Sequence, residues 1–186
     1  MTDPQEPDEP DRRVSLVVAA AVYGSILVAA CSWLSARDRG DQIAFLAIGE
    51  RGPWLGCAAG LVVGWLGARA FALSTGRSKH LRATEDAARL VFTGIDHRVV
   101  LAFVLFAVIA EELFFRLAVQ DAFGLPGAVA AYALLHTCTV GVGALPFAVA
   151  HAVVLGLLVQ HGFGLLGCTT AHAIMNHLTL RRILCT

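Results

Sequence analysis

Two adjacent carboxylates and an arginine interrupt an apolar run near the middle of the chain. The run covers residues 99–119, and the interrupting side chains are Glu111, Glu112 and Arg116. Ionisable side chains at membrane depth are costly, so they indicate a functional site. On a helix, Glu112 and Arg116 stand four residues apart on one face and can pair, whereas Glu111 points about 100° away. The sequence therefore predicts one carboxylate held by the arginine and one free for chemistry.

The composition is that of a membrane protein. Of the 186 residues, 57% are hydrophobic and 15% charged, and the mean hydropathy is +0.69, which is too apolar for an ordinary soluble domain. The 14 basic and 14 acidic residues balance, so the chain lacks the basic excess of nucleic-acid-binding proteins. The five cysteines form no Cys-x-x-Cys pair, which argues against a disulfide framework and a cysteine zinc site. We expect an all-α, polytopic integral membrane protein.

About six transmembrane helices are predicted, the fourth of them short. Clusters of glycine and proline separate the last four helices. The predicted helices cover residues 14–34, 54–73, 99–122, 128–140, 147–160 and 165–184.

The chain divides into three parts on this pattern. Residues 1–13 are acidic and proline-containing, and they are predicted to form a disordered tail. Residues 14–98 comprise two transmembrane helices and a charged segment, and residues 99–184 carry the remaining helices. The first apolar segment could instead be a secretion signal, because residues 28–31 resemble a lipoprotein cleavage box. We favour a retained helix, since the apolar run is long and polytopic sequence follows it.

Small residues recur along one side of the second predicted helix. These are Gly56, Gly60, Gly64 and Gly67. The spacing suits close helix packing in lipid, although ordinary membrane glycine content explains it equally well.

The most charged part of the chain, residues 74–98, is predicted to contain a helix lying on the membrane surface. Its apolar side chains share one face, and the charged ones are spaced for ion pairs within the helix. The face consists of Leu81, Ala88 and Phe92, and the expected pairs are Arg82 with Asp86 and Glu85 with Arg89.

The distribution of Lys and Arg predicts the orientation in the membrane. With six crossings and an inside N-terminus, ten basic residues face the cytoplasm and three face the outside. The inner group comprises Arg12, Arg13, the basic residues of 69–98, Arg181 and Arg182, and the outer group comprises Arg37, Arg39 and Arg51. We expect both termini in the cytoplasm and the protein in the plasma (inner) membrane.

Polar side chains on several predicted helices lie at one depth. With a rise of 1.5 Å per residue, Glu111, His136 and His172 each lie roughly 12 to 16 Å from the outer ends of their helices. His151 lies at about 14 Å on the same measure, and Asn176 shares a helix face with His172. Each histidine taken alone is more simply explained as a hydrogen-bonding residue between helices. Their common depth favours a shared site.

Carboxylates, imidazoles and an amide at one level are the groups needed to activate a water molecule and stabilise an oxyanion. The same inventory would suit a divalent metal such as zinc, held by Glu111, His136 and His172, although no His-Glu-x-x-His motif is present. The residues leave both possibilities open.

Three short motifs occur in order on successive predicted helices. They are Glu111-Glu112-x-x-x-Arg116, Tyr132-x-x-x-His136 and His172-x-x-x-Asn176. In these motifs, residues 99–184 resemble the CPBP family of intramembrane proteases, which includes CAAX proteases and bacteriocin-processing enzymes and is also described as type II CAAX prenyl endopeptidases. The second motif usually has phenylalanine where this chain has Tyr132.

The resemblance implies a proteolytic site in the membrane. Glu111 with His136 would activate water, and His172 with Asn176 would stabilise the oxyanion. Supporting roles then fall to Glu112, Arg116, Tyr132 and His151, of which His151 lies outside the three motifs. The implied partner is a membrane-associated protein or peptide substrate: a prenylated CAAX protein, a leader peptide or a C-terminal sorting tail.

Two other functions are compatible with the sequence. The first is a catalytically silent membrane scaffold or immunity factor on the same fold. The second is a histidine-ligated haem or redox carrier, which we favour less because it gives the Glu111, Glu112 and Arg116 set no role.

Overall fold

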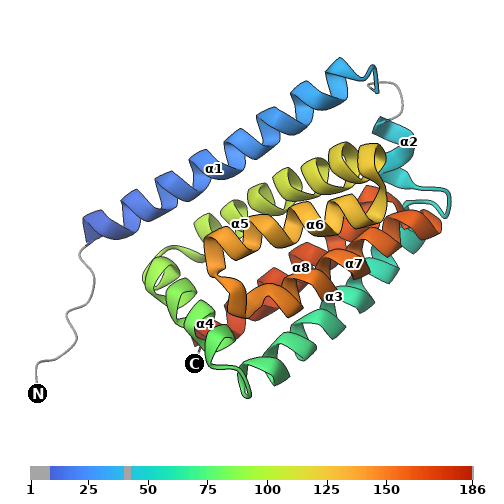
Figure 1. The fold of residues 1–186 in the computed structure, drawn as a ribbon. Coiled ribbons are helices and arrows are strands. Elements are labelled where there is room, and N and C mark those ends of the chain that lie inside the picture. The colour runs from blue at the N-terminus through green and yellow to red at the C-terminus, as the bar shows by residue number, and fades with distance from the viewer. Residues whose placement is uncertain (1–8, 40–42, 186) are drawn as a thin grey trace, which may run out of the picture.

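A computed structural model describes residues 9–39 and 43–185 of the chain (Figure 1). Within these ranges the chain is 91% helical and contains no strands, so the all-α prediction is confirmed. The α-helices are α1 (Glu9–Ala36), α2 (Ile43–Ile48), α3 (Pro53–Thr75), α4 (Lys79–Phe92), α5 (His97–Glu112), α6 (Asp121–Val140), α7 (Leu145–Leu158) and α8 (Gly164–Cys185). A short 3-10 helix (Val142–Ala144) and two π-helical segments (Leu113–Gln120 and Val159–Phe163) connect some of them.

The first helix starts earlier than the composition of the N-terminus predicts. The sequence places a disordered tail over residues 1–13, but α1 begins at Glu9. Residues 1–8 of that tail lie outside the described part of the chain. Charged residues at the start of a long apolar segment can continue its helix, because each added residue gains a backbone hydrogen bond on an existing turn.

The predicted breaks between the last four helices are present. Gly124 has φ 71° within the run assigned to α6, so the helix that continues from α5 ends there. Gly164 has φ 66° between α7 and α8. Both angles lie in the left-handed region, which glycine enters without a steric penalty and most other residues avoid. The sequence therefore fixes the points at which the helices turn.

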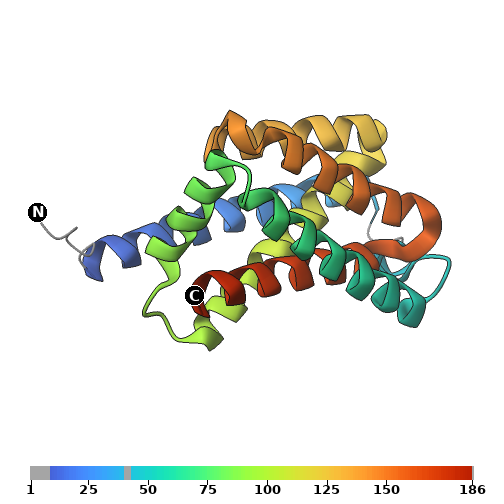
Figure 2. The ribbon, with the colours of Figure 1, turned by 90° about the horizontal axis from the view of Figure 1, so that it is seen from below.

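Helix α3 packs on α8 through glycine, so of the two explanations of the glycine spacing the structure favours close helix packing (Figure 2). Gly56, Gly60 and Gly64 are buried on α3. A Cβ atom on Gly60 would lie 2.5 Å from the carbonyl oxygen of Gly167 and 2.7 Å from Cβ of Thr170. The two backbones thus approach closely because α3 lacks side chains along this line, the arrangement typical of small-residue helix pairs in membranes.

We expect Gly60→Ala to lower the unfolding temperature of the purified protein in detergent. The added methyl group meets the α8 backbone, and overpacking of this kind costs about 1 to 3 kcal/mol. Gly24→Ala on α1 is the matched control, because a Cβ there meets nothing within 4 Å. Equal unfolding temperatures for the two variants would contradict a tight interface between α3 and α8.

Helix α4 is amphipathic and lies against the ends of other helices. Leu81 is its buried residue, as predicted. In the sequence analysis, Arg82 is paired with Asp86 and Glu85 with Arg89 within the helix. In the structure, Arg82 and Glu85 contact residues outside α4. Arg82 donates hydrogen bonds to the carbonyl groups of Thr75 and Gly76 at the end of α3, at 3.0 and 3.1 Å, and Glu85 pairs with Arg182 on α8. These contacts tie α4 to the bundle.

Three helical stretches among the described residues are long and apolar enough to cross a membrane. They are Ser15–Ala36, Pro53–Thr75 and Val142–Cys185, and the last of them contains the turn at Gly164. Large apolar side chains lie on the outer surface of the bundle, including Trp54 at 85% exposure and Val17 at 68%. An apolar surface of this extent is typical of contact with lipid, so the structure is compatible with a membrane protein.

Candidate active site

Glu111 and Glu112 are the last two residues of α5, and a π-helix follows them directly. Asp96 begins α5 by accepting a hydrogen bond from the backbone N–H of Arg98 at 2.7 Å, and the helix runs from there to Glu112. The chain continues as a π-helical segment that carries Arg116. Such segments are rare and often occur at functional sites. Glu111 and Glu112 therefore lie at the junction of the α-helix and the π-helical segment, where the angle between successive side chains changes.

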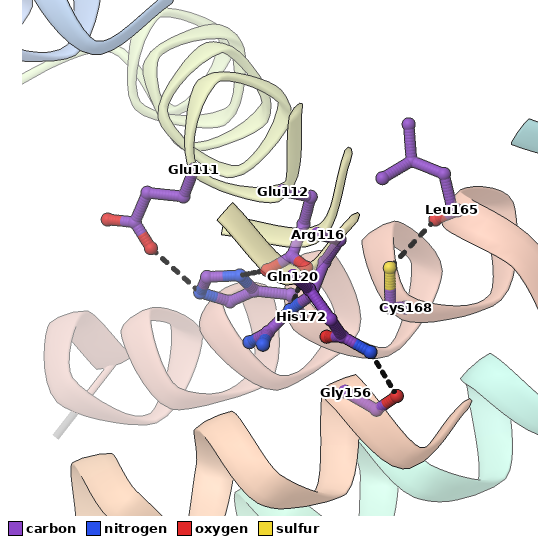
Figure 3. A network of polar contacts seen from close by, with 8 residues as sticks. All are labelled: Glu111, Glu112, Arg116, Gln120, Gly156, Leu165, Cys168 and His172. Atoms are coloured by element: carbon purple, nitrogen blue, oxygen red, sulfur yellow. Dashed lines mark hydrogen bonds and ion pairs between the residues drawn. The ribbon is translucent and has the colours of Figure 1, made fainter. Parts of the chain in front are cut away.

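A buried chain of polar contacts runs from Arg116 through Glu112 to His172 (Figure 3). Nε of Arg116 donates to Oε2 of Glu112 at 3.0 Å, which confirms the predicted pair. Nδ1 of His172 lies 2.7 Å from Oε1 of the same carboxylate. The three residues are at most 3% exposed. Because each carboxylate oxygen of Glu112 already has a hydrogen-bond partner, this residue holds Arg116 and His172 in place.

The contact with Glu112 also orients the imidazole of His172. A carboxylate bound to arginine accepts hydrogen bonds, so Nδ1 of His172 carries a proton. Nε2 then faces the other glutamate, with Oε2 of Glu111 at 3.8 Å (Figure 3). Among the described residues, this Oε2 atom has no hydrogen-bond partner although it is buried. Glu111 thus presents an unoccupied oxygen beside an oriented imidazole.

A cavity of about 330 Å³ opens beside Glu111. Six of the eight site residues predicted from the sequence line it: Glu111, Tyr132, His136, His151, His172 and Asn176. The other two, Glu112 and Arg116, lie behind His172 in the polar chain. Most of the wall is apolar, with Phe71 and Phe147 among its aromatic members. The predicted residues therefore converge on one space from α5, α6, α7 and α8.

The histidines from α6 and α7 are held by aromatic contacts. His136 stacks on Tyr132 with ring centroids 3.9 Å apart, and its Nδ1 donates to the Tyr132 carbonyl oxygen at 3.0 Å. Its Nε2 is consequently left for the cavity. The ring of His151 meets His172 edge-on at 4.7 Å, and within the described chain its buried Nε2 has no hydrogen-bond partner. His151 thus belongs to the wall of the site.

Two polar residues near the site were missed by the sequence analysis. Tyr23 on α1 lines the cavity together with Glu111. Gln120, in the π-helical segment, donates to the carbonyl oxygen of Gly156 at 3.0 Å and ties that segment to α7. Each has a sequence signal in retrospect: Tyr23 is the one aromatic hydroxyl of the first apolar segment, and Gln120 is the one amide of the third.

The metal alternative requires three ligand side chains that lie close together. Across residues 9–39 and 43–185, no three His, Cys, Asp or Glu side chains are grouped so that they could hold a metal ion. Glu111, His136 and His172 line the same cavity, but they do not form such a group. The steps derived below use the protein's own side chains.

No protein-family model matches the chain, and no match was found among curated proteins or among solved structures. The geometry of the site and the three motifs are thus the basis for its interpretation.

Proposed function

We propose that the chain is an intramembrane endopeptidase of the CPBP (CAAX protease-like) type, which hydrolyses a peptide bond of a membrane-associated protein or peptide. The observation that carries the proposal is the difference between the two adjacent carboxylates. Glu112 is engaged by Arg116 and His172, whereas Glu111 presents a buried oxygen to the cavity. A free carboxylate beside an oriented imidazole is an arrangement suited to general-base catalysis.

In the proposed reaction, Glu111 takes a proton from a water molecule as the water oxygen attacks the scissile carbonyl carbon. His136, through its Nε2, orients that water. The carbonyl oxygen becomes an oxyanion, which accepts hydrogen bonds from His172 and Asn176. His172 donates through Nε2 when it is protonated on both nitrogens, while its Nδ1–H stays hydrogen bonded to Glu112. Glu111 then delivers its proton to the leaving nitrogen, and the C–N bond breaks.

We also infer that six helical segments cross the membrane: α1, α3, α5 with its π-helical continuation, α6, α7 and α8. At 1.5 Å per residue, the continuous segment from α5 to residue 120 is long enough for a hydrocarbon layer of about 30 Å. Its buried carboxylates face the bundle interior, so their charge does not argue against a crossing. Helix α6 is a short crossing, because Gly124 interrupts its first turn.

The six-crossing topology predicts that reporter fusions placed after residue 186 or within residues 77–92 will report a cytoplasmic location. Ten of the basic residues outside the third apolar segment lie on that side in this topology. The measurement is a pair of fusions at each place, one active only in the cytoplasm and one active only outside it. An extracytoplasmic result at either place would overturn the six-crossing arrangement.

The test of the proposed function is a comparison of membrane peptides from cells that express the wild type, Glu111→Gln or no protein. We expect new peptide ends with the wild type that are missing from the other two samples. If Glu111→Gln gives the same ends as the wild type, the proposed base is wrong. If the wild-type protein is present but the peptide ends are the same in all three samples, a catalytically silent scaffold or immunity factor on this fold is the better explanation.

A further inference from the structure

The first helix contributes to the wall of the catalytic cavity, although the three motifs lie entirely in later helices. Helix α1 runs along one side of the bundle and packs against α5 (Figure 1). Among the described residues, it contributes one side chain to the cavity wall, Tyr23. This side chain is polar and lies beside Glu111, the residue proposed above as the base. A structural helix in lipid would need no such group at this position.

The ring of Tyr23 is held in place from α5. It packs edge-on against Phe103 with centroids 5.8 Å apart and an interplanar angle of 75°. Phe103 in turn packs against Phe92 of α4, also at 5.8 Å. The aromatic contact holds the ring of the phenol, and its side chain lines the same cavity as the carboxylate of Glu111. The phenol is therefore part of a packed structure.

We propose that Tyr23 is a positioning residue for Glu111, and that α1 is accordingly part of the active site. The inference rests on the proposed function. A glutamate has three rotatable side-chain bonds, and Oε2 of Glu111 has no hydrogen-bond partner among the described residues. The phenol donates to the carboxylate and holds it at the cavity, where its remaining lone pairs face His172 and the incoming water. Displacement of a reacting group by about 1 Å can cost about 10²-fold in rate.

The informative variant is Tyr23→Phe, which removes the hydroxyl group and keeps the ring that packs on Phe103. The control is Ser25→Ala, which removes an exposed hydroxyl group on the same helix that donates to the carbonyl oxygen of Ala21 at 2.8 Å. Glu111→Gln is the reference for complete loss of the carboxylate. All three are compared with the wild type as full-length protein purified in detergent.

The first measurement is infrared difference spectroscopy, which needs no substrate. The band that disappears in Glu111→Gln identifies the Glu111 carboxyl group. We expect Tyr23→Phe to shift this band and Ser25→Ala to leave it in place. An unshifted band in Tyr23→Phe would show that the phenol does not hold the carboxylate, and the inference would be overturned.

The second measurement is steady-state kinetics on a synthetic peptide that spans the cleavage site found in the membrane-peptide comparison. We expect Tyr23→Phe to lower kcat about 10- to 100-fold with KM and the unfolding temperature unchanged, and Ser25→Ala to match the wild type. A wild-type kcat in Tyr23→Phe would overturn the positioning role even if the infrared band moves. Cleavage by Glu111→Gln would instead overturn the proposed function, and the infrared result would still decide the contact.

Discussion

Glu111→Gln is expected to abolish peptide-bond cleavage by the purified protein and to leave its unfolding temperature close to that of the wild type. An amide of the same shape cannot accept the proton of the attacking water, and loss of a general base costs about 10²- to 10⁴-fold in rate. The fold should tolerate the change because Oε2 of Glu111 has no hydrogen-bond partner in the described chain and lies 3.8 Å from His172. No fixed contact at that oxygen is lost.

The measurement is the rate of cleavage of the same synthetic peptide, together with thermal unfolding of each sample. Glu50→Gln makes the identical chemical change at an exposed position and serves as the control. Near wild-type cleavage by Glu111→Gln would contradict the assignment of this residue. A large fall in its unfolding temperature would mean that the carboxylate has a structural role as well.

Glu112→Gln is expected to destabilise the fold, in contrast to the same change one residue earlier. The carboxylate accepts from Nε of Arg116 at 3.0 Å and from Nδ1 of His172 at 2.7 Å, and all three groups are buried. Removal of one partner from a buried ion pair leaves an uncompensated charge, which typically costs about 3 to 5 kcal/mol. Here the guanidinium of Arg116 is the charge that loses its counter-ion.

The measurement is denaturant unfolding of Glu111→Gln and Glu112→Gln in the same mixed micelles. The two variants are matched in chemistry, burial and position along the helix, so the difference in the free energy of unfolding isolates the role of the Arg116 and His172 contacts. We expect Glu112→Gln to be the less stable variant and to express poorly. The opposite order of stability would reverse the roles given to the two glutamates.

Local sequence patterns predicted the helices and the convergence of polar groups well. Helix α3 and the breaks at Gly124 and Gly164 follow from apolar length and from the backbone angles that glycine permits. The pair of Glu112 with Arg116 follows from helical spacing. The shared site was predicted from a common depth, since helices that are packed side by side bring residues of equal depth together.

Contacts between distant segments were not predictable in the same way. Glu112 and His172 are 60 positions apart, and their contact depends on how α5 and α8 pack. The link from Glu85 to Arg182 crosses helices for the same reason, and charge spacing alone suggested partners within α4. The π-helical turn that carries Arg116 is also invisible to a pattern based on a period of 3.6 residues, because its hydrogen bonds run from residue i to i+5.

The polar chain joins residues that are synthesised at different times. Glu112 and Arg116 lie in one helix and can pair as soon as it forms, but His172 is made 60 residues later. Until then, Glu111 and Glu112 lack the imidazole that lies between them. A nascent third segment released into lipid at that stage would expose these carboxylates to hydrocarbon, which is costly. If α5 crosses the membrane as proposed, synthesis of α8 completes the burial of its carboxylates, and a chain stalled before residue 172 should be only partly released into the bilayer.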